Sequence, residues 1–164
     1  MTTRTLPTYF MSHGGGPWPW MKDQMRGAYD RLEAPLAVIY PNADVPVLQL
    51  SLKCGYDPSD HIAVGRALAP LRDQGVLIVG SGLSYHNLRE FGPGAKAASP
   101  AFDEWLQATL VTASAAERIT ALIEWEAAPA ARRAHPQADH LLPLMVAVGA
   151  AGNDSATRVY HEDN

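Results

Sequence analysis

Apolar residues follow two different spacings along the chain, and each spacing predicts a different kind of element. Four consecutive apolar residues at positions 76–79 predict a strand that is buried on both faces. Gly80 and Gly82 follow, so this strand is expected to enter a glycine-rich loop whose backbone can turn tightly. Residues 6–11 predict a short strand, and residues 47–52 alternate with the period of two that predicts another strand.

Apolar residues at helical spacing predict several helices between and after these strands. These helices are expected to begin near residues 17, 57, 99, 114 and 135. The second should end near Gln74, where Gly75 is a natural stop, and the last is apolar almost all round and should be buried. A strand, a helix and a strand with short connections are typical of a parallel pair. The sequence therefore predicts an α/β fold, with a mainly parallel or mixed sheet flanked by helices.

Composition and charge narrow the class of protein. With 164 residues, 47% of them hydrophobic and 18% charged, the chain is predicted to form one globular domain over residues 1–164. The formal net charge is -4 and no run of Lys or Arg is present, which argues against nucleic-acid and anionic-membrane partners. The single cysteine, Cys54, permits no intrachain disulfide and fits a reducing compartment. Neither a signal peptide nor a membrane-spanning stretch is evident, so a cytoplasmic location is expected.

Histidines are the clearest candidates for chemistry, and the chain has six of them. His61, in the first turn of the helix near residue 57, is expected to pack or to face solvent, and His161 lies in a polar tail. The other four stand at the edges of predicted elements: His13, His86, His135 and His140. Imidazole is a preferred ligand of first-row divalent metals. With no CxxC or HExxH motif present, the spacing alone leaves two interpretations open, one shared metal site or four separate packing histidines.

A hydrolase is a further alternative, because residues 13–16 (His-Gly-Gly-Gly) resemble the oxyanion segment of esterases and lipases. Such an enzyme needs a Gly-x-Ser-x-Gly turn between a strand and a helix. The nearest stretch, residues 80–84 (Gly-Ser-Gly-Leu-Ser), does not fit this motif, and no helix is predicted directly after it. The hydrolase is therefore the least favoured hypothesis.

Several longer motifs, taken in their order along the chain, resemble those of the class III extradiol ring-cleaving dioxygenases. The group with the greatest resemblance is the DOPA-type dioxygenases, which are similar to the catalytic β subunit of protocatechuate dioxygenase. The matching stretches cover most of the chain and are residues 12–17 (Ser-His-Gly-Gly-Gly-Pro), 40–51, 65–72, 75–82, 86–89 (His-Asn-Leu-Arg) and 135–144.

This resemblance implies a non-haem Fe(II) or Zn(II) site, at which dioxygen opens a catechol-type ring beside a hydroxylated carbon. Carried over motif by motif, His13 and His140 would be metal ligands. His86 would be either a further ligand or the acid/base residue beside the metal, so the expected catalytic residues are His86 and His13. A divalent metal can lower the pKa of a bound catechol, and a histidine of near-neutral pKa can move the released proton. The role of His135 stays open.

The chain also departs from the family pattern. Family members carry a Ser-x-His-Trp type motif that supplies another histidine ligand, and an Asp-His-Gly segment, and neither is present here. The chain passes from residues 30–34 straight to Pro35, as if a central section had been deleted near residues 34–35. Asp139 stands where the family usually has Glu. A shortened version of the family's fold is therefore predicted, with exposed sheet edges that favour self-association into a homo-oligomer, a rearranged sheet or reduced stability.

Two functional hypotheses follow from these observations. In the first, the chain is a non-haem metal-dependent extradiol dioxygenase that acts on a catecholic substrate with dioxygen. In the alternative, it is a shortened, catalytically impaired relative that binds metal and serves as a binding or assembly module.

Overall fold

The computed structural model describes residues 5–12, 48–90, 95 and 97–159. The chain divides into two compact units, residues 1–11 together with 52–164, and residues 12–51. All the helices described below belong to the first unit. The predicted helix near residue 17 and the predicted deletion near residues 34–35 lie outside the described residues, and the single domain stays a prediction.

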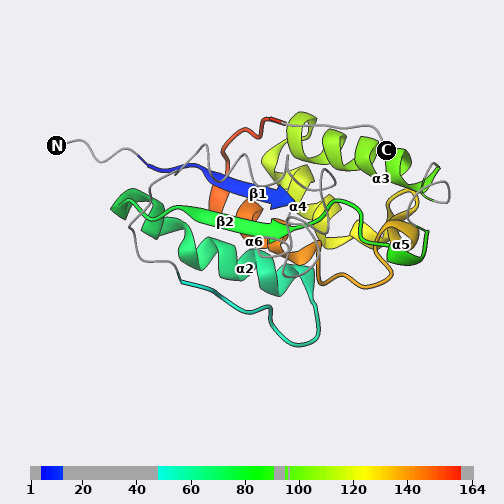
Figure 1. The fold of residues 1–164 in the computed structure, drawn as a ribbon. Coiled ribbons are helices and arrows are strands. Elements are labelled where there is room, and N and C mark those ends of the chain that lie inside the picture. Colours follow the sequence, from blue (N-terminus) through cyan, green and yellow to red (C-terminus); the bar gives the residue numbers. More distant parts are fainter. Residues whose placement is uncertain (1–4, 13–47, 91–94, 96, 160–164) are drawn as a thin grey trace, which may run out of the picture. The chain divides into compact units, whose positions relative to one another are not determined.

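Two parallel strands form the sheet of the described part, and they lie side by side in Figure 1. Strand β1 is Thr8–Ser12, which confirms the strand predicted for residues 6–11, and strand β2 is Ile78–Gly82. Helix α6, Leu142–Ala151, packs against β2. The predicted α/β class, with helices flanking a parallel sheet, is confirmed.

Two strand predictions require correction. The apolar run predicts burial of residues 76–79 on both faces, but β2 begins at Ile78 and buries only every second residue. Val76 and Val79 are 42% and 39% exposed, because within the described part α6 covers one face of β2 only. Residues 48–52 form no strand. An alternating segment becomes a strand only beside a neighbour that completes its hydrogen bonds, and the described sheet consists of β1 and β2 alone.

Helix α2, Pro58–Leu68, begins where the sequence predicts. The carboxylate of Asp57 caps it by accepting hydrogen bonds from two backbone N–H groups of the first turn, at 2.7 and 3.2 Å. A 3-10 segment, Ala69–Gln74, then leads to Gly75, whose φ of 83° is the left-handed conformation that favours glycine. His61 is buried on α2, and both of its ring nitrogens contact backbone groups, at 2.6 and 3.2 Å, which confirms a packing role.

Helices α2 and α6 approach each other closely at two glycines. A methyl group on Gly65 or Gly149 would lie 2.1 or 2.2 Å from a backbone carbonyl oxygen of the opposite helix. Helix α6 is buried almost all round, as its composition predicts, but it begins at Leu142 instead of near residue 135. Residues 135–141 form turns and bends instead, and Pro143 stands in the first turn of α6, where a missing N–H breaks no helical hydrogen bond.

The remaining helices enclose the core beside α6. They are α3 (Ala98–Gln107), which continues as a π-helical segment (Ala108–Thr112), α4 (Ala115–Ile123) and α5 (Ala131–Ala134). Ser114 and Glu117 form a capping box at the start of α4, where the sequence predicts that a helix begins. Phe102, Leu122 and Trp125 are buried in this core.

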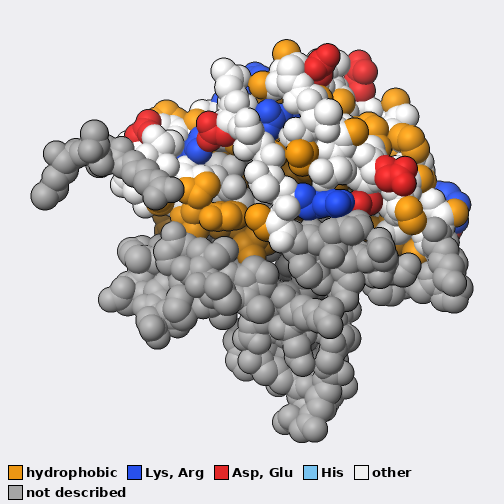
Figure 2. Space-filling view, turned by 90° about the horizontal axis from the view of Figure 1, so that it is seen from above, with side chains coloured by type: hydrophobic (Ala, Val, Ile, Leu, Met, Phe, Trp, Pro, Cys, Tyr) orange, Lys and Arg blue, Asp and Glu red, His pale blue; other side chains and the backbone are white. Residues whose placement is uncertain are grey.

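The surface of the described part carries mixed charges. Figure 2 shows one face of the molecule, on which Lys, Arg, Asp and Glu side chains are interspersed with hydrophobic ones. Among the described residues on this face, Lys and Arg side chains form no continuous block. Among the described residues, no helix has the length and apolar character needed to cross a bilayer.

Gly65→Ala is expected to lower the free energy of unfolding by about 1–3 kcal/mol, because the added methyl group meets backbone atoms that cannot rotate away. Chemical denaturation followed by circular dichroism measures this change. Ala63→Ser is the matched control, because Ala63 is exposed on the same helix and its substitution should cost less than about 0.7 kcal/mol. A Gly65→Ala protein as stable as the wild type would contradict the close contact between α2 and α6.

Candidate metal centre

Two chain segments that are distant in sequence are hydrogen-bonded to each other at the carboxyl end of β2. One is the loop of residues 83–87, which follows β2, and the other runs through residues 133–140 from α5 toward α6. The backbone N–H of Leu83 donates to the carbonyl oxygen of His140 at 2.9 Å, and the N–H of His86 donates to that of Ala134 at 2.8 Å. These bonds fix the backbones of His86 and His140 relative to each other.

Glycines in β2 make this close approach possible. A methyl group on Gly82 would lie 2.2 Å from the carbonyl oxygen of His140, and one on Gly80 would lie 2.3 Å from that of Pro143. Any larger residue at Gly82 would therefore push the His140 segment away from β2. The glycines at the end of this strand therefore leave the space that the backbone of the His140 segment occupies.

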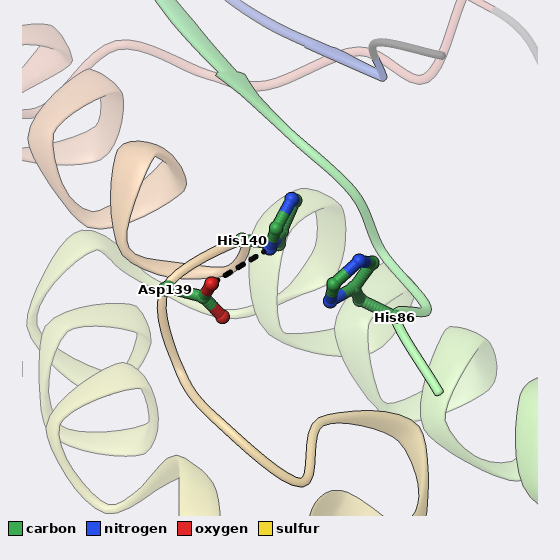
Figure 3. A group of neighbouring side chains, drawn as sticks. All are labelled: His86, Asp139 and His140. Atoms are coloured by element: carbon green, nitrogen blue, oxygen red, sulfur yellow. Dashed lines mark ion pairs between the residues drawn. The ribbon is translucent and has the colours of Figure 1, made fainter. Parts of the chain in front are cut away.

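The side chains of His86, Asp139 and His140 meet beside these backbone bonds (Figure 3). The imidazole rings of His86 and His140 are stacked, with centroids 3.5 Å apart and planes inclined by 23°. Oδ2 of Asp139 lies 3.1 Å from Nδ1 of His140. One potential metal-ligating atom from each of the three side chains lies within 4.8 Å of the others, and all three residues are partly buried.

The electrostatics of the cluster favour unprotonated donor atoms. Burial lowers the pKa of His86 below its ordinary value, and the charge of His140 lowers it further. Burial by itself would raise the pKa of Asp139, but the hydrogen bonds and charge of His140 outweigh it, so this pKa is lowered. At neutral pH the cluster therefore contains a neutral imidazole at His86 and a carboxylate at Asp139, the forms in which these groups bind metals.

The donor set fits a divalent first-row metal. Imidazole nitrogens suit Zn and Fe, and a carboxylate oxygen adds one compensating negative charge. Oδ1 of Asp139 is buried, and within the described part of the chain it has no hydrogen-bond partner. A buried polar atom without a partner is unfavourable, so a cation or its bound water at this place would stabilise it.

His135 lies in the same loop but outside the cluster. Its side chain is fully buried and packs edge-on against the rings of Phe102 and Trp125, with centroids 5.2 and 6.1 Å away. Its Nε2 lies 3.0 Å from the carbonyl oxygen of Ser84, and because a carbonyl only accepts, Nε2 carries the proton. His135 therefore links the two loops as a structural residue, which settles the role that the sequence leaves open.

The sequence correctly identifies two of the three residues in this cluster. His86 and His140, both predicted as metal ligands, are brought together, whereas His13 lies outside the described residues. Asp139 is the member that the sequence motifs do not assign to the site. Its signal in the sequence is its position directly before His140.

His135 is expected to make stability depend on pH. Burial lowers its pKa from 6.5 to about 4, so between these values the unfolded chain binds a proton that the folded chain does not. Stability from this residue is complete above pH 6.5 and decreases as the pH falls. In urea denaturation of metal-free protein, the wild type should lose about 2–3 kcal/mol from this residue between pH 7.5 and 4.5.

His135→Gln provides the comparison, because a glutamine amide can still donate to Ser84 but does not titrate. The variant should lack this part of the pH dependence, while the contribution of the carboxylates stays the same in both proteins. Equal losses of stability in the two proteins would contradict a neutral, buried His135.

Comparisons with known proteins identify the family of this chain. The family model described as "Catalytic LigB subunit of aromatic ring-opening dioxygenase" matches residues 32–163. The chain is 41% identical over 143 residues to a protein of Beta vulgaris named 4,5-DOPA dioxygenase extradiol, covering 85% of this chain and 52% of that protein. It is 34% identical over 121 residues to the protein of that name from Escherichia coli K12, covering 70% of this chain and 44% of the relative.

A solved structure of an uncharacterized Escherichia coli K12 protein is similar in fold, with a TM-score of 0.58 and 23% identity. The alignment covers 88% of this chain and 75% of that one. The chain spans about half the length of the curated relatives it matches. The resemblance to the class III extradiol dioxygenases is confirmed, and the chain belongs to the LigB family of aromatic ring-opening dioxygenases.

Proposed function

We propose that this chain is a metal-dependent extradiol dioxygenase that opens catechol-type rings with dioxygen. The observation that carries the proposal is the group of His86, Asp139 and His140 at the carboxyl end of β2, the edge where open α/β sheets hold their ligands. Membership of the LigB family and relatives named as dioxygenases support it.

We propose His13, His86 and His140 as the residues that hold the metal, with Fe(II) or Zn(II) as the ion. His86 and His140 are supported by their stacked rings and by the backbone bonds that fix them. His13 is supported by the family motif and by its position in the sequence directly after β1. A bound divalent metal supplies the positive charge that lowers the pKa of a catechol hydroxyl and prepares the ring for dioxygen.

The chain's own residues contribute position and proton transfer. His86 is neutral at physiological pH because its pKa is lowered, so a ring nitrogen can either bind the metal or accept a proton from a catechol hydroxyl. The carboxylate of Asp139 contacts His140 and limits its rotation. The partial burial of all three side chains restricts water at the cluster and strengthens these electrostatic interactions.

The relatives carry the names of dioxygenases, so the comparisons do not favour the alternative of a catalytically impaired binding module. We also propose a homo-oligomer in the cytoplasm. Leu48 and Leu50 are 95% and 66% exposed, and Val79 is exposed on the sheet, which leaves apolar side chains for a second copy to cover. The single cysteine fits a reducing compartment.

Anaerobic titration with Fe(II), followed by oxygen uptake with a panel of catechols, tests the proposal. We expect about one ion per chain and oxygen uptake that requires both iron and a catechol. His140→Ala should bind iron more than about 10-fold more weakly and lose oxygen uptake, because a ligand is missing. Gln137→Ala, an exposed position in the same loop, is the control and should behave as the wild type.

The same titration on His86→Ala distinguishes the two roles of that residue. If His86 is a ligand, the His86→Ala protein should bind iron more weakly than the wild type does. Full iron binding with loss of oxygen uptake would instead assign His86 to proton transfer. A wild-type protein that binds no divalent metal would contradict the proposed function.

A further inference from the structure

We propose that Asn87 is a positioning residue, whose buried amide ties the loop of residues 83–87 to the segment of residues 133–140 and so keeps the two imidazole rings of the cluster together. The inference rests on the proposed function in one respect, the metal held by these rings. Asn87 belongs to the His-Asn-Leu-Arg stretch of residues 86–89, from which the proposed function uses His86 alone.

The side-chain amide of Asn87 has one orientation. Asn87 is only 6% exposed, and its Nδ2 donates a hydrogen bond to the carbonyl oxygen of Arg133 at 2.8 Å. Its Oδ1 accepts the backbone N–H of Arg89 at 3.1 Å, which shapes the turn into the 3-10 segment Leu88–Glu90. Because a carbonyl can only accept and an N–H can only donate, a flip of the amide would break both bonds.

The bridge of Asn87 reaches the end of α5. Arg133 and Ala134 are the last two residues of that helix, and the terminal carbonyl groups of a helix have no partner within it. The carbonyl of Ala134 accepts the backbone N–H of His86 at 2.8 Å, and that of Arg133 accepts the amide of Asn87. Consecutive residues of the loop therefore bind consecutive carbonyl groups of the helix end, which fixes the direction of the chain as it leaves His86.

A second contact joins the same two parts of the chain after His86, and it is the weaker one. Arg133 and Glu90 form an ion pair at 2.7 Å, but their side chains are 53% and 37% exposed, so water screens the attraction. The amide of Asn87 is shielded from water. Loss of its bond leaves a buried carbonyl without its donor, which costs more than the loss of an exposed ion pair. Asn87 is therefore the stronger of these two ties.

The imidazole rings of His86 and His140 come from the two segments that this bridge joins, and their centroids are 3.5 Å apart (Figure 3). Because His86 directly precedes Asn87, a shift of the loop against the segment changes the separation of the rings. Residues that bind one metal must be held within a narrow range of positions by the groups that support them. Asn87 thus acts on the metal through the positions of the two rings.

Nuclear Overhauser contacts between the ring protons of His86 and His140, recorded by NMR on the metal-free protein, test the inference without metal or activity. In Asn87→Ser, the hydroxyl can still accept the N–H of Arg89, but the side chain is too short to donate to Arg133. We expect the contact between the rings in the wild type and its loss in Asn87→Ser. Leu88→Ser, at a position that is 71% exposed, is the control and should keep it.

Co(II) titration of the same proteins separates positioning from a general loss of stability. Asn87→Ser should bind Co(II) about 10-fold more weakly than the wild type, as expected when a residue that orients metal ligands is lost. Gly65→Ala, which is destabilised at the contact between α2 and α6, should bind Co(II) as the wild type does. Asn87→Asp adds a negative charge that favours a cation, so weaker binding by this variant as well would report the lost bond.

An Asn87→Ser protein that keeps the contact between the rings would overturn the inference, whatever its affinity for Co(II). Equal weakening of Co(II) binding in Asn87→Ser and Gly65→Ala would also overturn it, because a loss of stability would then explain both results. A wild type that binds no metal would contradict the proposed function, whereas loss of the ring contact in Asn87→Ser would still support the role of Asn87.

Discussion

The hydrogen bonds between the loop after β2 and the segment that leads into α6 are the constraint on which the site depends. Leu83 and His86 donate backbone N–H groups to His140 and Ala134, and His135 donates a ring N–H back to the carbonyl of Ser84. These bonds join residues that are about fifty positions apart in the sequence, and the bond to His140 requires the absence of a side chain at Gly82. Asn87 adds a side-chain hydrogen bond to the carbonyl oxygen of Arg133 at 2.8 Å, which joins the same two segments.

One short loop carries two histidines, His135 and His140, which differ in burial and therefore in role. His135 is enclosed by Phe102 and Trp125, and its low pKa keeps it neutral, so it can hold the loop by one hydrogen bond without a buried charge. His140, five residues later, is partly exposed and stands beside a carboxylate. The structural histidine shapes the loop, and the chemically available one lies where solvent, a metal or a substrate can reach it.

Local features of the sequence predict the elements well, and tertiary features less so. The helix starts near residues 57 and 114 and the stop at Gly75 depend on neighbouring residues only, and all are confirmed. The strand predicted at residues 47–52 is wrong, because pairing depends on a partner strand that local alternation cannot specify. Spacing also could not separate His135 from His140, since the difference between them is the aromatic enclosure supplied by α3 and the segment after α4.

A crystal structure of the protein loaded anaerobically with Fe(II), with anomalous scattering recorded at the iron edge, would test the central claim most directly. The account predicts one anomalous peak at the carboxyl end of β2, about 2.0–2.2 Å from a ring nitrogen of His140 and beside His86. A peak located away from this cluster would contradict the account.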